Sequence, residues 1–128
     1  MNDTVKSIAA AVCALLGYLF GELDGMITAL ITLIVLDYIT GIIAAVIEKR
    51  LSSEVGAKGI AKKVIMLLVV AVANVADRAV IGEGNVLRSV AAMFYIANEG
   101  ISLLENGARL GVPMPRKLID ILAQIKDE

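Results

Sequence analysis

The feature that most constrains this chain is an unbroken apolar run at residues 26–47. The run holds twenty-two residues, and the only side chain in it that is charged at neutral pH is that of Asp37. An α-helix rises about 1.5 Å per residue, so the run reaches roughly 33 Å and can cross a hydrocarbon core of about 30 Å. We therefore predict a membrane-spanning helix over these residues.

Three further apolar runs accompany this one, at residues 5–21, 64–81 and 86–104. The first is the shortest and could also be read as a signal peptide, but the next run follows almost at once, which favours a helical hairpin. Arg88, Asn98 and Glu99 interrupt the last run. The sequence predicts an all-α integral membrane protein with four transmembrane helices, or three if the first run does not span.

Composition agrees with a membrane protein and excludes most enzyme chemistry. The chain is 59% hydrophobic and 20% charged, and it contains no His, no Trp and one Cys. Triads that use His, His-ligated metals and intrachain disulfides are therefore excluded, and we expect no catalytic residue, cofactor or metal. A net charge of -1 gives no general reason to bind nucleic acid. We read Cys13 as a packed small side chain.

The distribution of Lys and Arg predicts the orientation. Ten of the twelve lie at the N-terminus, in the connector at 48–63 and in the C-terminal tail, namely Lys6, Lys49, Arg50, Lys58, Lys62, Lys63, Arg109, Arg116, Lys117 and Lys126. The connectors at 22–25 and 82–85 carry no Lys or Arg but hold Glu22, Asp24 and Glu83. Basic segments stay in the cytoplasm, so four spans would place both termini inside, and three would place the N-terminus outside.

Two cytoplasmic segments have patterns of their own. The sequence GAKGIAKK at 56–63 lacks the spacing of a phosphate loop, and we read it as a basic loop that enters the third helix. Residues 116–126 follow a cluster of Gly and Pro, and their apolar side chains recur at helical spacing. They predict an amphipathic helix, which either lies on the cytoplasmic face of the bilayer or packs on a neighbouring subunit.

Asp37 is the polar residue that most needs an explanation. A carboxylate at mid-bilayer costs at least about 2.5 kcal/mol, so it must be protonated, meet a partner or face water. On a helix it shares a face with Gly41, Ala44 and Ala45, which would let another helix approach closely. The face is therefore either a contact between helices, with Asp37 bonded to a hydroxyl or amide, or the lining of an aqueous opening.

Other polar side chains form two further groups. Asn74, Asp77 and Arg78 stand one turn apart near the outer end of the third run, and a Glu105–Arg109 pair is expected to stabilise the fourth helix locally. The candidates for lining a pore or for contacts between subunits are Asp37, Gly41, Asn74, Asp77, Asn98, Glu99, Ser102 and Asn106.

At these residues the chain resembles the small bacteriophage holins of Gram-positive hosts, which include toxin-secretion holins. The resemblance rests on LDYITG at 36–41, LSSEVGAKGIAKK at 51–63, the Ala- and Val-rich run that ends in Asp77, and NEGISLLENGARLGVPMP at 98–115. It covers about two thirds of the chain, and we treat residues 1–128 as one membrane domain.

The resemblance implies a protein of the bacterial cytoplasmic membrane that forms homo-oligomers among lipids. Its lesions would release an endolysin, causing host lysis, or a toxin. A competing interpretation is a small proton-coupled multidrug or ion transporter that uses Asp37, although the chain has no Trp and only five Tyr and Phe for an aromatic cage. A scaffold that recruits a cytoplasmic partner through the basic connector and tail is a third.

Overall fold

A computed structural model describes residues 2–82 and 84–127, and these residues form helices with no strand among them. The prediction of an all-α protein is confirmed. In chain order the elements are α1 (Asp3–Phe20), α2 (Gly25–Ile47), α3 (Ser53–Ala76), its π-helical extension η1 (Asp77–Ile81), α4 (Val86–Arg109) and α5 (Arg116–Asp127).

Local sequence signals set where the first three helices begin and end. Asn2, Asp24 and Ser52 each precede a helix, and each side-chain oxygen accepts a hydrogen bond from the backbone N–H three residues ahead, at 2.8, 3.0 and 3.1 Å. Gly21 ends α1 with φ +76°, and Gly82 ends η1 with φ +93°. Glycine adopts these left-handed conformations without a steric penalty, which lets the chain reverse within a few residues.

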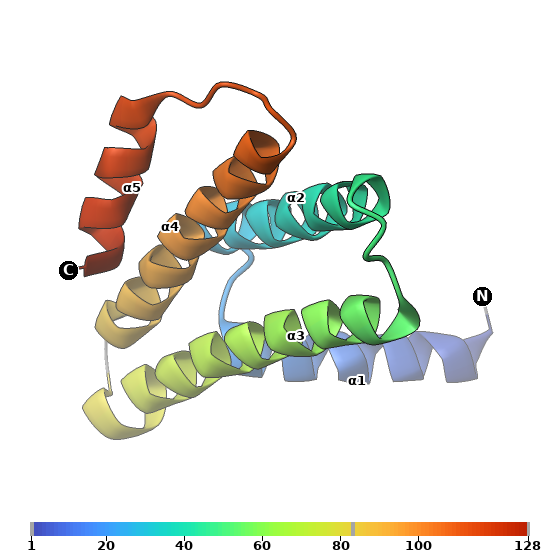
Figure 1. Cartoon of the computed structure of the whole chain (residues 1–128). Helices are drawn as coiled ribbons and strands as arrows, with labels where there is room; N and C mark the ends of the chain where they lie inside the picture. Colours follow the sequence, from blue (N-terminus) through green and yellow to red (C-terminus); the bar gives the residue numbers. More distant parts are fainter. Residues whose placement is uncertain (1, 83, 128) are drawn as a thin grey trace.

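Helix α4 lies at the centre of the molecule and packs against α2, α3 and α5 (Figure 1). Helix α1 lies along α3 and runs in the same direction, whereas α2 runs the opposite way (Figure 1). The apolar core lies where α2, α3 and α4 meet and includes Leu30, Ile34, Val70 and Ala92. Helix α1 contributes no fully buried residue: Phe20 packs against the core, but most of its other apolar side chains are exposed and available to lipid or another chain. Cys13 is among the exposed residues, so the prediction that it is packed is wrong.

Three helices are long and apolar enough to cross a membrane: α1, α2, and α3 continued by η1. Helix α1, which the sequence left open, is one of them. Helix α4 is not, because its 24 residues include Arg88, Glu99, Glu105 and Arg109. By length and composition the described chain therefore has three candidate spans, the lower of the two predicted numbers, although the helix that drops out is α4 rather than α1.

The connector between α2 and α3 is much shorter than the sequence suggested. Helix α3 begins at Ser53, so GAKGIAKK is helical and the prediction of a basic loop there is wrong. The physical reason is the helix start at Ser52, whose hydroxyl caps the first turn while Glu54 stands near the positive end of the helix dipole. Lys58, Lys62 and Lys63 consequently lie on a helix.

Helix α5 folds back along α4 of the same chain (Figure 1). A Cβ atom added to Gly100 would lie 3.1 Å from Leu122, and one added to Gly107 would collide with the end of the Met114 side chain. Two glycines of α4 thus make room for the returning segment. The helix predicted at 116–126 is present, and the surface it covers belongs to its own chain.

Candidate functional site

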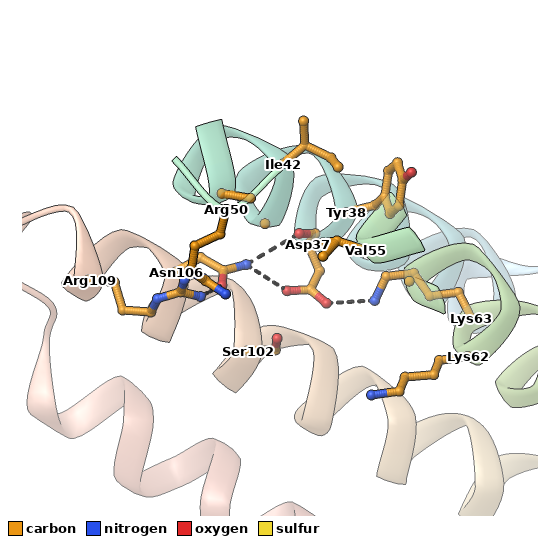
Figure 2. Close-up of a pocket in the computed structure, with 13 residues that line it drawn as sticks. Asp37, Tyr38, Ile42, Arg50, Val55, Lys62, Lys63, Ser102, Asn106 and Arg109 are labelled. Carbon is orange, nitrogen blue, oxygen red and sulfur yellow. Dashed lines mark hydrogen bonds and ion pairs between the residues drawn. The ribbon is translucent and has the colours of Figure 1, made fainter. Parts of the chain in front are cut away.

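Ionisable and polar side chains from three helices meet in what we call the charge cluster: Asp37 and Thr40 of α2, Lys63 of α3, and Glu99 and Asn106 of α4. The Lys63 Nζ atom donates to Asp37 Oδ2 at 2.6 Å and to Glu99 Oε1 at 2.7 Å. The Asn106 amide donates to Asp37 Oδ1 at 3.0 Å and to Thr40 Oγ1 at 2.9 Å. Figure 2 shows Asp37 between Asn106 and Lys63.

This cluster is buried and its formal charges do not cancel. The side chains of Asp37, Glu99 and Lys63 are 7%, 2% and 16% exposed. One ammonium group faces two carboxyl groups, so the cluster carries one negative charge in excess when all three are ionised. Removing three charges from water costs several kcal/mol per ion, which only close pairing and hydrogen bonds offset.

Small residues on α2 permit this close approach. Ala44 and Ala45 are buried, and a Cβ atom on Gly41 would stand 3.6 Å from the Asn106 amide nitrogen. The face predicted to share Asp37 with Gly41, Ala44 and Ala45 is therefore the one that receives α4. Within one chain it makes the contact between helices that the sequence proposed, and Lys63 supplies a charged partner in addition to the expected amide.

A second group of polar side chains, which we call the anchor cluster, lies at the opposite end of α4 and consists of Asp24, Asn74, Asp77 and Arg88. Arg88 is 3% exposed, and its guanidinium donates to Phe20 O, Glu22 O and Asp24 Oδ2, each at 2.8 Å. It thereby ties the start of α4 to the end of α1 and to the connector before α2.

Two more anchor residues bind backbone groups at helix ends. The Asp77 carboxylate accepts from the backbone N–H groups of Leu87 and Arg88 at 3.0 and 2.8 Å, so it caps α4. The Asn74 amide donates to the carbonyl oxygens of Tyr18 and Leu19, both at 3.0 Å. Its own oxygen is buried, and the described residues supply no donor to it.

Carboxyl groups outside the helices respond to their arginine partners. The Arg88 guanidinium beside Asp24 holds the pKa of that carboxyl below its ordinary value, and the Ile27 backbone N–H adds to the effect. Arg50 and Arg109 both bond the carboxylate of Glu48 and lower its pKa. Arg109 thus reaches α2, and the predicted pairing with Glu105 on α4 is wrong.

A cavity of about 340 Å³ lies beside the charge cluster, between α2, α3 and α4. Its wall includes four cationic side chains, those of Arg50, Lys62, Lys63 and Arg109, and Figure 2 shows them on two sides of Asp37. Gly41, Ser102 and Asn106 also line it.

The candidates therefore separate into different settings. Asp37, Glu99 and Asn106 meet in the charge cluster, Gly41 and Ser102 line the cavity, and Asn74 and Asp77 belong to the anchor cluster. Asn98 is half-buried and bonds no described residue through its side chain. The basic residues Lys49, Arg50, Lys58, Lys62, Arg109, Arg116 and Lys117 are exposed, and Glu83 lies outside the described residues.

The sequence did not reveal the roles of two residues, Lys63 of the charge cluster and Arg88 of the anchor cluster. The prediction of a basic loop includes Lys63, although Ser52, Ser53 and Glu54 form a recognisable helix start that places it almost three turns into α3. In the sequence, Arg88 is only an interruption of the fourth apolar run. Most of its partners are backbone carbonyl groups, and residue types do not show which backbone groups a side chain will bond. Within residues 2–82 and 84–127, no three His, Cys, Asp or Glu side chains gather as a metal site.

The sequence pattern of the bacteriophage holin family matches residues 14–127. An uncharacterized 14.9 kDa protein of the nagH 3′ region of Clostridium perfringens is 46% identical over 80 residues, which are 62% of this chain and 61% of the relative. A probable holin of Bacillus phage phi105 is 39% identical over 80 residues, 62% of this chain and 58% of the relative.

An uncharacterized protein of Listeria monocytogenes, Lmo0128, is 44% identical over 72 residues, which are 56% of this chain and 51% of the relative. The matched segment thus spans between about half and three fifths of the length of these relatives. No solved structure matches the chain.

Proposed function

The chain belongs to the bacteriophage holin family, and from this premise we propose that it oligomerises in the bacterial cytoplasmic membrane and forms lesions through which a folded endolysin or a toxin crosses. The probable holin of phage phi105, which is 39% identical over 80 residues, supports a lytic role. We propose no enzymatic step.

The observation that carries the proposal is the charge cluster itself. Three ionisable side chains lie about halfway along helices whose outer surfaces are apolar. Within one chain these groups bond one another, and four packed helices enclose no passage for a folded protein. When many chains associate, the same polar face can turn from its own helices to a shared aqueous edge, so the subunits supply a lining that one chain lacks.

This proposal makes α4 a fourth span. Its 24 residues reach roughly 36 Å at about 1.5 Å per residue, which is enough to cross. Arg88 and Glu99 count against it by composition, but both are buried against other helices and never meet lipid. With α4 as a span, α1 and α3 cross in one direction and α2 and α4 in the other, and both termini lie in the cytoplasm.

Cysteine labelling tests this topology. In a Cys13→Ser background, a cysteine placed at Ser53, at the start of α3, should resist a reagent that cannot cross the membrane of intact cells. It should react once the membrane is opened. A cysteine at Gly84, in the connector before α4, is the matched control and should react in intact cells. Labelling of the Ser53 position in intact cells would invert the proposed topology.

Lesion formation is tested by graded expression. One subunit cannot enclose a wide passage, so release of a folded cytoplasmic reporter should be absent below a threshold of protein and rise steeply above it. Membrane potential is recorded alongside. Reporter release that is proportional to protein from the lowest dose, or loss of ions without any protein release, would contradict the proposal.

A proton-coupled transporter is the second candidate, because a buried acid such as Asp37 next to Lys63 is also what proton exchange uses. The variants Asp37→Asn and Glu99→Gln separate the two. A transporter should lose drug tolerance with either variant and never release protein. A holin should still insert, with the time or the extent of permeabilisation changed.

A further inference from the structure

We propose that the cavity between α2, α3 and α4 binds the phosphate group of an anionic phospholipid from the cytoplasmic leaflet. The choice of a lipid as the source of that phosphate rests on the proposed topology, which places this end of the bundle in the cytoplasm. The phosphate chemistry rests on the cavity alone.

The first argument is charge. The cavity wall carries Arg50, Lys62, Lys63 and Arg109, and Asp37 is its single acidic side chain. Lys63 bonds both Asp37 at 2.6 Å and Glu99 at 2.7 Å, so these three groups together carry one negative charge in excess when all are ionised. Arg50 and Arg109 share a single oxygen of Glu48, so that pair of guanidinium groups keeps one positive charge in excess. Lys62 makes no ion pair with any described residue and adds a second positive charge, so the cavity and its surroundings keep one net positive charge after the excess negative charge of the charge cluster is counted.

The second argument is hydrogen-bonding capacity. A guanidinium has five N–H donors, and the bonds seen here occupy one nitrogen of Arg50 and two of Arg109. The Ser102 hydroxyl lines the same cavity, and the described residues give it no partner. Phosphate oxygens accept several charge-assisted bonds at once, and arginine forks match their geometry.

The third argument is size and wall chemistry. A volume of about 340 Å³ accommodates a phosphate diester with its glycerol rather than a single small ion. Apolar side chains, those of Ile42, Ala45 and Val55, complete the wall. A free phosphate ion gains nothing from such a surface, whereas the backbone of a phospholipid does. Basic pockets between helices on the cytoplasmic side have this composition when they hold anionic headgroups.

The test uses the full chain in a nonionic detergent. Apparent dissociation constants are taken from the dependence of thermal unfolding on added dioleoyl phosphatidylglycerol, dioleoyl phosphatidylcholine or inorganic phosphate. We expect phosphatidylglycerol to stabilise the chain, with phosphatidylcholine and inorganic phosphate giving much smaller shifts. The variant Lys62→Gln should raise the apparent dissociation constant for phosphatidylglycerol about fivefold. Lys62 is exposed, so its loss leaves folding intact.

The matched control is Lys58→Gln. Lys58 stands one turn earlier on α3, is also exposed and does not line the cavity. It should leave the binding constant unchanged. Equal weakening by both variants would reduce the effect to general charge attraction and overturn the site, as would equal binding of the two lipids. Inorganic phosphate binding as tightly as phosphatidylglycerol would overturn the lipid assignment.

This outcome is independent of lesion formation. Binding is measured in detergent with no cell and no expression threshold, so failure of the lipid site leaves the graded-expression experiment to decide the holin role. A chain that binds phosphatidylglycerol but never releases a reporter would refute the holin role and leave the lipid site standing.

Discussion

The charge cluster and the anchor cluster are both mostly buried and both contain ionisable side chains, but these side chains bond different kinds of chemical group. In the anchor cluster, Arg88, Asp77 and Asn74 bond mainly backbone carbonyl and N–H groups at helix ends. Those groups have no hydrogen-bond partner inside their own helices, so the bonds satisfy backbone groups that every helix end leaves unpaired. In the charge cluster, Lys63, Asp37 and Glu99 bond one another in mid-helix, where every backbone group already has a partner.

This difference separates a structural role from a candidate functional one. The anchor cluster joins α1, η1 and α4 and needs no further explanation. Stability alone explains the charge cluster poorly, since apolar side chains of similar volume often replace a buried ion pair at no loss. Two carboxyl groups and one ammonium group held in mid-helix at that cost are better explained by a state of the protein in which the cluster meets water.

The largest expected effect is that of Lys63→Met. It leaves the carboxyl groups of Asp37 and Glu99 buried without a cation, which should lower the free energy of unfolding by about 3–5 kcal/mol. Reversible unfolding in mixed detergent micelles measures this loss. The triple variant Lys63→Met, Asp37→Asn, Glu99→Gln removes all three charges and should recover most of the stability.

The same triple variant sharpens the contrast between the clusters. If the charges serve a water-facing state, the variant should fold and insert but release a cytoplasmic reporter late or not at all. Normal release by the triple variant would make the charge cluster as structural as the anchor cluster.

Arg88→Gln should have the next largest effect. It removes charge-assisted bonds to Phe20 O, Glu22 O and Asp24, and we expect a loss of about 2–3 kcal/mol. Since Arg88 joins α4 to the end of α1, the variant should also loosen α1, measured as weaker disulfide crosslinking between cysteines placed on α1 and α3. A loss of stability with unchanged crosslinking would mean that Asn74 alone holds α1.

The sequence predicted the helices well because their signals are local. The apolar runs at 26–47, 64–81 and 86–104 lie within α2, α3 with η1, and α4, and the run at 5–21 passes the end of α1 by one residue. The cost of a charge in lipid singles out Asp37 and Glu99. The sequence does not show which residues pair with these two acids, because the Lys63 partner of Asp37 lies 26 residues away on another helix. The sequence predicted α4 as a span, and by length and composition it is not a candidate; because hydropathy counts Arg88 and Glu99 as charges whether or not they are buried, its crossing of the membrane stays a prediction.

Asp77→Ala should cost less, about 1–2 kcal/mol, because it removes the cap from two backbone N–H groups of α4 while leaving no charge unpaired. Asp77→Asn keeps one acceptor and should recover part of the loss. Chemical unfolding of the two variants side by side measures the difference. An Asn variant as unstable as the Ala variant would show that the charge of Asp77, rather than its capping bonds, stabilises this end.

The smallest expected effect concerns the pH dependence of the anchor cluster. The pKa of Asp24 lies below its ordinary value of 3.8 in the folded chain, chiefly through Arg88, so its contribution to stability is fully present above that value and is lost as the pH falls through the lowered one. The side chain is 41% exposed and screened by solvent, so the contribution should stay below about 1 kcal/mol.

Asp24→Asn keeps a cap for α2 without the charge, and the free energies of unfolding of this variant and the parent chain should converge as the pH falls below 3.8. Asp3→Asn, at an exposed acid with no ion pair among the described residues, is the control and should change this acid dependence much less. A difference between the Asp24 variant and the parent that stays constant down to the lowest pH would mean that Arg88 holds its place through the carbonyl groups of Phe20 and Glu22 alone.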